Sequence, residues 1–224
     1  MNLRCYRTIA FDCDGVLLDS NRVKTEAFRA AALPYGEEAA EALVQHHVTY
    51  GGVSRYRKFA YFLDEIVPAI ADQELDRSAL PGYDALLEAY AAAVHDGLRN
   101  CALAEGLESL RARTDDARWL VISGGDQAEL RAVLMERGIA RHFDGGIFGS
   151  PDSKAEILSR EIEASNIRMP ALFLGDSQFD YEVAAENGLD FVFVSGWTDM
   201  PDWYEFFAQR DVTVIANLRA LTAA

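Results

Sequence analysis

The sequence contains few cysteines and no long run of apolar residues. Its 224 residues include three cysteines, Cys5, Cys13 and Cys101, an odd number without the spacing of a metal site or a disulfide framework. Such sparse use of cysteine fits a reducing compartment. No segment approaches the ~18 consecutive apolar residues of a membrane span, and no signal-peptide core precedes the first expected strand. These absences predict a soluble, cytoplasmic protein.

Positive charge is also scarce. Lysine and arginine together number 21 against 36 acidic residues, which gives a formal net charge of −15. A field of that sign repels nucleic acids and anionic membranes, so we expect neither as a partner. A small anionic ligand is still compatible with it, because local basic groups can override the overall field. Three of the basic residues are lysines: Lys24, Lys58 and Lys154.

Short apolar or β-branched segments recur along the chain and predict six strands. Most are almost continuously apolar, which is typical of strands buried on both faces of a sheet. Helical patterns separate the later ones, as at residues 126–138, where Asp126 and Glu129 form a capping-box pattern and Gly138 ends the helix. The alternation predicts an α/β fold with a Rossmann-like parallel sheet covered by helices on both faces. The expected strands are residues 6–11, 118–123, 145–149, 171–175, 190–195 and 212–215.

Between the first and second expected strands lies a long segment that is rich in helix formers and shows no strand pattern. We predict a helical insertion over residues 20–97, with residues 1–19 and 98–224 forming the catalytic core. Ligands of open α/β sheets bind at the carboxyl ends of the strands, so the insertion would cover that edge as a lid. The expected helical segments are residues 21–33, 37–48, 54–67, 74–80 and 83–98.

Residues that can carry chemistry follow four of the expected strands. In an extended backbone, residues two apart point the same way, so Asp12 and Asp14 face one site while Cys13 points away. Two carboxylates facing one site repel each other, and a hard cation such as Mg²⁺ relieves that repulsion. The four sets, in chain order, are Asp12 and Asp14; Ser123, Gly124 and Gly125 at a helix start; Lys154; and Asp176 and Asp180.

The order and chemistry of these sets resemble the haloacid dehalogenase (HAD) superfamily. Its motifs are D-x-D-G, a strand-terminal Ser or Thr, a Lys, and G-D-x-x-x-D. They read here as DCDG (12–15), VISGG (121–125), SPDSK (150–154) and GDSQFD (175–180). The resemblance extends over the whole chain, because helical caps of the C1 type enter that family's core after the first motif. The pattern is similar to members of the phosphoglycolate phosphatase and β-phosphoglucomutase type.

This resemblance implies a Mg²⁺-dependent phosphatase acting on a small phosphorylated metabolite. By the family pattern, Asp12, the main-chain carbonyl of Asp14, and Asp176 would bind the metal. Asp12 would attack phosphorus to give an aspartyl-phosphate. Asp14 would protonate the leaving alcohol and then deprotonate the attacking water, which needs a carboxyl with a raised or environment-tuned pKa.

The remaining motif residues receive supporting roles from the same resemblance. Ser123 and the amides after it, beginning with Gly124, would hold phosphate oxygens near a helix N-terminus. Lys154 would neutralise charge on the phosphoryl group and the nucleophile, and Asp180 would orient Lys154 or a metal-bound water. Lys154 lacks the glycine or proline that commonly stands beside this lysine, so the path of its loop is open.

The expected insertion carries a basic loop and helix start at residues 50–59. The Gly51-Gly52 pair precedes Arg55 and Lys58, which are three residues apart and share a helix face, whereas Arg57 points elsewhere. Arg55 and Lys58 could bind a second anionic group of the substrate, such as a carboxylate. The alternative is a solvated basic face.

Other conspicuous residues have plainer interpretations. We expect Cys13 to be a packed core thiol and Trp197 to serve packing rather than the rim of the site. His46 and His47 are adjacent on a helix and diverge by about 100°, so we expect surface or packing roles and no shared metal. Asp19 and Ser20 would form the turn that starts the first helix of the insertion.

Two other functions are compatible with these motifs. A phosphomutase of the β-phosphoglucomutase type shares every core motif and differs in excluding water from the aspartyl-phosphate. A non-enzymatic phospho-accepting domain also uses strand-end carboxylates, but the D-x-D-G spacing and the insertion argue against it. Dehalogenation is disfavoured because dehalogenase members lack the second aspartate, which is Asp14 here. The sequence leaves open whether the protein is a monomer or a homodimer.

Overall fold

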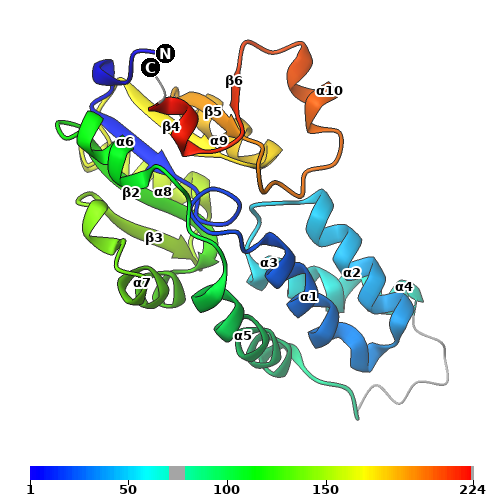
Figure 1. The fold of residues 1–224 in the computed structure, drawn as a ribbon. Helices are drawn as coiled ribbons and strands as arrows, with labels where there is room; N and C mark the ends of the chain where they lie inside the picture. The colour runs from blue at the N-terminus through cyan, green and yellow to red at the C-terminus, as the bar shows by residue number, and fades with distance from the viewer. Residues whose placement is uncertain (71–78, 223–224) are drawn as a thin grey trace.

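The computed structural model describes residues 1–70 and 79–222 of the chain. The strands in this part form one parallel sheet in the order β3-β2-β1-β4-β5-β6 (Figure 1). This confirms the predicted α/β fold. The strands are β1 (Thr8–Phe11), β2 (Arg118–Asp126), β3 (Gly146–Ser150), β4 (Ala171–Gly175), β5 (Asp190–Val194) and β6 (Thr213–Ile215).

The central strand β1 decides where the site lies. It pairs with β2 on one side and β4 on the other, with Ile9 opposite both Trp119 and Leu172. All four of its residues are buried, as its apolar sequence predicts. Immediately after it, the main-chain N–H of Asp12 donates to the carbonyl of Leu174 at 2.9 Å. Asp12 therefore leaves the middle of the sheet between the ends of two neighbouring strands.

Helices cover both faces of the sheet. Side chains of α6 (Leu107–Arg113) and α7 (Gln127–Glu136) share a hydrophobic cluster with Ile9 and Phe11 of β1. Those of α8 (Lys154–Glu163), α9 (Gln178–Glu186) and α10 (Trp203–Ala208) share a second cluster with Ala10. Successive strand residues thus face opposite layers.

The start of α7 differs in part from its prediction. Asp126 caps the helix as expected, because its Oδ1 accepts the N–H of Glu129 at 2.9 Å. However, β2 does not end at Ser123 but continues to Asp126, and the helix begins at Gln127. The apolar run ends at Ser123, whereas the extended backbone continues through Gly124 and Gly125, which sequence patterns do not distinguish from a helix start.

Between β1 and β2 the described chain is helical, with no strand in residues 20–70 or 79–97. We call residues 20–97 the helical insertion. The helix expected at residues 74–80 lies largely outside the described residues. In Figure 1, α1 to α4 gather on the side towards which the strand arrowheads point. The helices are α1 (Asn21–Ala32), α2 (Glu37–Thr49), α3 (Arg55–Tyr61), α4 (Val67–Ile70) and α5 (Tyr83–Asn100), with a π-helical turn at Phe62–Ile66.

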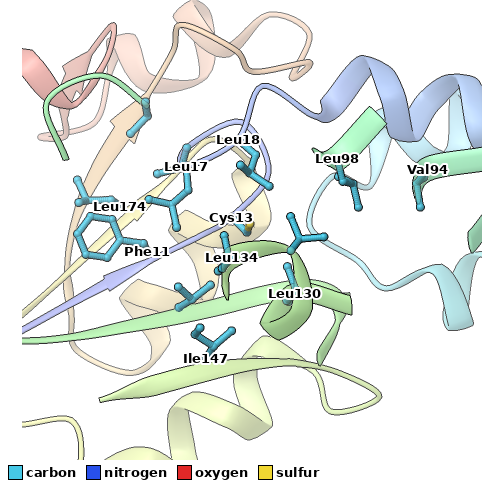
Figure 2. Packing of buried hydrophobic residues seen from close by; sticks show 14 of the residues in the cluster. Phe11, Cys13, Leu17, Leu18, Val94, Leu98, Leu130, Leu134, Ile147 and Leu174 are labelled. Carbon is cyan, nitrogen blue, oxygen red and sulfur yellow. The ribbon is translucent and has the colours of Figure 1, made fainter. Parts of the chain in front are cut away.

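The helical insertion has an aromatic centre that is continuous with the core of the sheet. The ring of Phe28 lies 4.4 Å from that of Tyr90 and 5.1 Å from that of Phe59, measured between centroids. Farther along α5, Val94 and Leu98 join the cluster that contains Leu130 and Leu134 of α7 (Figure 2). One apolar cluster therefore ties the insertion to the sheet.

Cys13 belongs to this cluster and is fully buried, beside Leu18 and Leu134 in Figure 2. Burial raises the pKa of its thiol well above the usual value, which suppresses the reactive thiolate. The prediction of a packed core thiol is confirmed. All three cysteines are free. In the described residues, no helix is both long and apolar enough to cross a bilayer.

The shared core predicts a large stability effect at α5. Leu86 is fully buried, whereas Leu33, also in the insertion, is 40% exposed. Leu86→Ala should lower the free energy of unfolding by about 2–5 kcal/mol because it leaves a cavity, and Leu33→Ala by less than about 1 kcal/mol. Urea unfolding measures both. Equal losses would show that Leu86 does not lie in a packed core.

Candidate active site

Three carboxylates meet at the ends of β1 and β4. Asp12 follows β1, Asp176 follows β4, and Asp180 lies in the first turn of α9. All three are buried, and one oxygen from each lies within 4.8 Å of the other two. The predicted convergence of these motifs at one edge of the sheet is therefore observed.

Lys154 lies between two of these carboxylates. Its Nζ is 2.9 Å from Oδ2 of Asp12 and 2.5 Å from Oδ1 of Asp180. Burial opposes the charge of this ammonium, but the two carboxylates outweigh that effect and raise the pKa of Lys154. Its loop path is now defined: Ser153 and Glu156 form a capping box, so that α8 begins at Lys154 itself.

Asp180 is held on both oxygens. One binds Lys154, and the other accepts from the amide and hydroxyl of Ser177, at 3.2 and 2.7 Å, and from the amide of Asp176 at 3.3 Å. These contacts fix the carboxylate as a support for Lys154 and occupy its lone pairs. Asp180 is therefore a poorer candidate for a metal ligand than Asp12 or Asp176, although all three are close together.

The site carries more buried negative charge than Lys154 balances. Burial raises the pKa of Asp12 to about 7, and the Asp180 and Asp14 carboxylates add to the effect that Lys154 opposes. Burial and the Asp12 carboxylate likewise raise the pKa of Asp176 well above its usual value. Hard oxygen ligands gathered at this spacing fit a divalent cation such as Mg²⁺.

Gly15 permits this crowding. Its φ is +74°, and a Cβ at this position would lie 2.0 Å from Oδ2 of Asp176 and 2.7 Å from Nδ2 of Asn21. The glycine of D-x-D-G is thus required both by its backbone conformation and by space.

Asp14 is bound by residues at the start of the insertion. The hydroxyl of Ser20 donates to its Oδ1, and Nζ of Lys24 to its Oδ2, each at 2.5 Å. Burial would raise the pKa of Asp14, but Lys24 and Ser20 together hold it below its usual value. Of the expected raised or environment-tuned pKa, the second is found: the environment lowers the pKa of Asp14, and this arrangement favours the ionised, basic form.

Ser20 directly precedes α1, as predicted, although its side chain makes no capping hydrogen bond to the helix. Its hydroxyl donates to Asp14 instead. A sequence pattern for helix starts cannot distinguish a serine that caps a helix from one that binds a carboxylate. Asp19 lies at the turn as expected, with its amide donating to the carbonyl of Ala102 at 3.0 Å.

Ser123 and Gly124 lie at the same edge of the sheet. Ser123 is fully buried, and its hydroxyl accepts the amide of Gly125 at 3.1 Å. From the sequence, the amides of Gly124 and Gly125 are expected to lie at a helix start. They lie in β2 instead, because α7 begins only at Gln127. A Cβ on Gly124 would lie 2.2 Å from the carbonyl oxygen of Gly52, so the insertion touches the core here.

The loop around Gly51 and Gly52 lies over the site. A Cβ on Gly52 would be 3.2 Å from Oγ of Ser177 and 3.5 Å from Nζ of Lys154. Beneath and beside this loop is a cavity of about 440 Å³, which is lined from the core by Asp12 and Asp14 and from the insertion by Lys24 and Lys58, among others.

The insertion's basic residues face this cavity. Arg55 and Lys58 are buried and line it, whereas Arg57 is exposed, so the predicted common face is confirmed and a solvated basic face is wrong. Arg55 is 2.7 Å from Oε2 of Glu129 on α7 and 5.0 Å from the ring centroid of Tyr90. Its charge is already matched by the core.

The sequence motifs did not predict a place in the site for three residues that the structure brings there. Lys24 reaches Asp14; Asn21 donates to Oδ2 of Asp176 and to the carbonyl of Trp197, both at 2.8 Å; His47 lines the cavity. The scarcity of lysine was the available signal for Lys24. The sequence pattern assigns His47 and His46 together to surface or packing roles. That role fits His46, whose ring stacks on the ring of Tyr61.

Comparisons with known proteins agree with the geometry. A family model described as haloacid dehalogenase-like hydrolase matches residues 6–188. A curated relative, Tyrosine-protein kinase PtkA of Mycobacterium tuberculosis, is 26% identical over 96% of this chain and 71% of its own length. This level of identity does not carry the activity in that name to the present chain.

Solved structures share the fold at low sequence identity. One is a predicted phosphoglycolate phosphatase from Haemophilus somnus, with a TM-score of 0.73, 17% identity and 96% of each chain covered. Another is CbbY from Rhodobacter sphaeroides in complex with xylulose-(1,5)bisphosphate, with a TM-score of 0.68, 20% identity and 95% of each chain covered.

The charge imbalance predicts a pH-dependent cost in stability. The native chain keeps a proton on Asp12 up to a pKa of about 7, whereas an ordinary Asp releases it near 3.8. Stability is therefore lost as the pH rises through this window. With divalent ions chelated, Asp12→Asn should raise the free energy of unfolding by roughly 1–3 kcal/mol at about pH 8 and by less at about pH 5.

The exposed Asp115 provides the matched control. Asp115→Asn should change stability little at either pH when both proteins are unfolded in urea. A gain for Asp12→Asn that is equal at the two pH values would contradict the predicted burial cost of Asp12.

Proposed function

Because the chain belongs to the haloacid dehalogenase-like hydrolases, we propose that it is a Mg²⁺-dependent phosphatase that hydrolyses a small phosphate monoester. One observation carries this proposal: a buried lysine ammonium lies between Asp12 and Asp180, beside the carboxylate of Asp176. This arrangement provides a nucleophile, positive charge for a phosphoryl group and oxygen ligands for a metal within one enclosed site.

Mg²⁺ would be held by Asp12, the main-chain carbonyl of Asp14, and Asp176. When bound, it would offset the negative charge of the phosphoryl oxygens and of the carboxylates around them. The donors suit it because they are hard oxygens and because burial and neighbouring carboxylates disfavour the ionised forms of Asp12 and Asp176, an effect that a bound cation would offset.

In the first half of the proposed reaction, a carboxylate oxygen of Asp12 forms a bond to phosphorus, and the bond from phosphorus to the substrate's alcohol oxygen breaks. Lys154 opposes the rise in the pKa of Asp12 and so favours its ionised form, and it would lie beside the charge that develops. Asp14, once protonated, gives its proton to the departing oxygen, and the hydroxyl of Ser123 and amides such as that of Gly124 bind phosphate oxygens.

In the second half, a water oxygen attacks phosphorus and the bond to Asp12 breaks, which releases phosphate. Asp14 accepts the proton of that water. The contacts with Lys24 and Ser20 support this half directly, because they keep Asp14 in the ionised form that a base requires.

Residues 1–19 and 98–224 are proposed as the catalytic core and residues 20–97 as a cap. Contacts between the two support this division of labour: Lys24 with Asp14, Arg55 with Glu129, and Gly52 against Gly124. Together they place the insertion against the site edge of the sheet and the first turn of α7. A cap in this position would select the substrate and exclude bulk water.

A phosphomutase is the second candidate, because the site is nearly closed. Asp12 is only 3% exposed, and the loop at Gly52 lies over Lys154. A mutase needs such closure to protect its aspartyl-phosphate from water. Isomerisation of a sugar phosphate without release of inorganic phosphate would favour this candidate over the phosphatase.

The three free cysteines support a reducing compartment, and we propose that the protein acts in the cytoplasm. Its net charge of −15 opposes nucleic-acid and membrane partners. The proposed partner is a small phosphorylated metabolite.

Phosphate release from p-nitrophenyl phosphate tests the proposal. We expect turnover with Mg²⁺, loss of turnover in EDTA and recovery on adding Mg²⁺. Asp12→Asn should lower kcat by at least about 10³-fold, because it removes the nucleophile, while circular dichroism shows the fold unchanged. A phospho-accepting domain would give one equivalent of phosphoenzyme without continuing release of phosphate. Normal turnover by the Asp12→Asn variant would exclude Asp12 as the nucleophile.

The acid role of Asp14 predicts a dependence on the leaving group. Asp14→Asn should lower kcat/KM for an alkyl phosphate by about 10²–10⁴-fold. It should lower kcat/KM for p-nitrophenyl phosphate far less, since that leaving group departs without a proton. Equal losses with the two substrates would show that Asp14 does not protonate the leaving oxygen.

A further inference from the structure

Four buried cations lie in or beside the cavity, and three of them already have a carboxylate partner. Lys154 pairs with Asp12 and Asp180, Lys24 with Asp14, and Arg55 with Glu129. The fourth is Lys58, which makes no ion pair with any residue that the structure describes.

Lys58 is held by a neutral partner instead. Only 1% of the residue is exposed, and its Nζ lies 2.7 Å from Nδ1 of His47 and 3.3 Å from the carbonyl of His47. Burial and the nearby Lys58 ammonium hold the pKa of His47 well below its usual value, so the imidazole is neutral and accepts a hydrogen bond. The pair therefore carries at most one positive charge, that of the Lys58 ammonium.

That charge is costly where it lies. Nζ is 5.6 Å from the centroid of Phe28, and burial together with Lys24 lowers the pKa of Lys58 to about 7. A buried ammonium without a counter-charge is destabilising unless an anion approaches it. Both Lys58 and His47 line the 440 Å³ cavity that Asp12 and Asp14 also line, so a ligand in this cavity can supply the anion.

We propose that Lys58, positioned by His47, binds a second anionic group of the substrate, and that this group is a carboxylate. The proposal rests on the phosphatase function above and narrows its substrate to a small phosphorylated carboxylic acid. One spare positive charge matches a carboxylate, whereas a phosphate dianion would leave a buried charge unmatched. Arg55, which the sequence had grouped with Lys58, is excluded from this role because Glu129 already neutralises it.

The wild-type protein provides the first test. Its kcat/KM for 2-phosphoglycolate is compared with that for 2-phosphoglycolamide, in which a neutral amide replaces the carboxylate at almost the same size. We expect a preference for the carboxylate of roughly 10- to 100-fold, as for a hydrogen bond to a charged group. A ratio near one would overturn the subsite, and a higher rate with a bisphosphate of similar size would overturn the choice of a carboxylate.

Substitutions at Lys58 test whether this residue causes the preference for the carboxylate substrate. Lys58→Met keeps most of the side-chain length and should reduce the ratio to near one, whereas Lys58→Arg should retain part of it. Arg57→Met is the matched control, because Arg57 neighbours Lys58 on α3 but is exposed, and it should leave the ratio unchanged. An undiminished ratio in Lys58→Met would place the carboxylate elsewhere.

Different results would reject the phosphatase function and the Lys58 subsite. Absence of phosphate release from every ester, including p-nitrophenyl phosphate, would reject the phosphatase function. Normal release from p-nitrophenyl phosphate without a carboxylate preference would reject only the Lys58 subsite. Should Lys58→Met not fold, the wild-type ratio and Lys58→Arg still decide the question.

Discussion

The rest of the site depends on the ion pairs that the buried ammonium of Lys154 makes with two carboxylates. This ammonium contacts Asp12 and Asp180 at once, and without it these carboxylates would face each other in a region that excludes water. The fold supplies the components from separate elements: a central strand for Asp12, and the first turns of two helices for Lys154 and Asp180. Removal of such a buried lysine typically costs about 3–5 kcal/mol, because buried carboxylates are left without their partner.

Charge also joins the helical insertion to the core. Lys24 brings positive charge to Asp14, and Arg55 brings it to Glu129, both in positions that are largely protected from solvent. Such contacts are strong only while they exclude water, so they favour a closed arrangement over the cavity. Lys58 differs because its hydrogen-bond partner is a neutral imidazole. This difference supports the proposal that Lys58 binds a second anionic group, in addition to the phosphoryl group.

Sequence patterns identified the sheet, the insertion and the strand-end motifs, because continuous apolar runs and carboxylates at strand ends reflect local constraints. Asp12, Asp176 and Lys154 were found in this way, and the structure brings them together. Lys24 and His47 could not be placed, because their roles depend on how α1 and α2 pack over the strand ends. For the same reason the sequence could not show that Lys24, a residue of the insertion, holds the pKa of Asp14 below its usual value.

In the proposed mechanism, Asp12 carries the phosphoryl group during turnover. The most direct measurement is acid quenching during steady turnover, reduction with borohydride and peptide mass spectrometry. Borohydride converts an aspartyl-phosphate to homoserine, so we expect homoserine in place of Asp12 when substrate and Mg²⁺ are present, and none in EDTA. Continued turnover with Asp12 unmodified, or with phosphate on another side chain, would show that Asp12 is not the nucleophile.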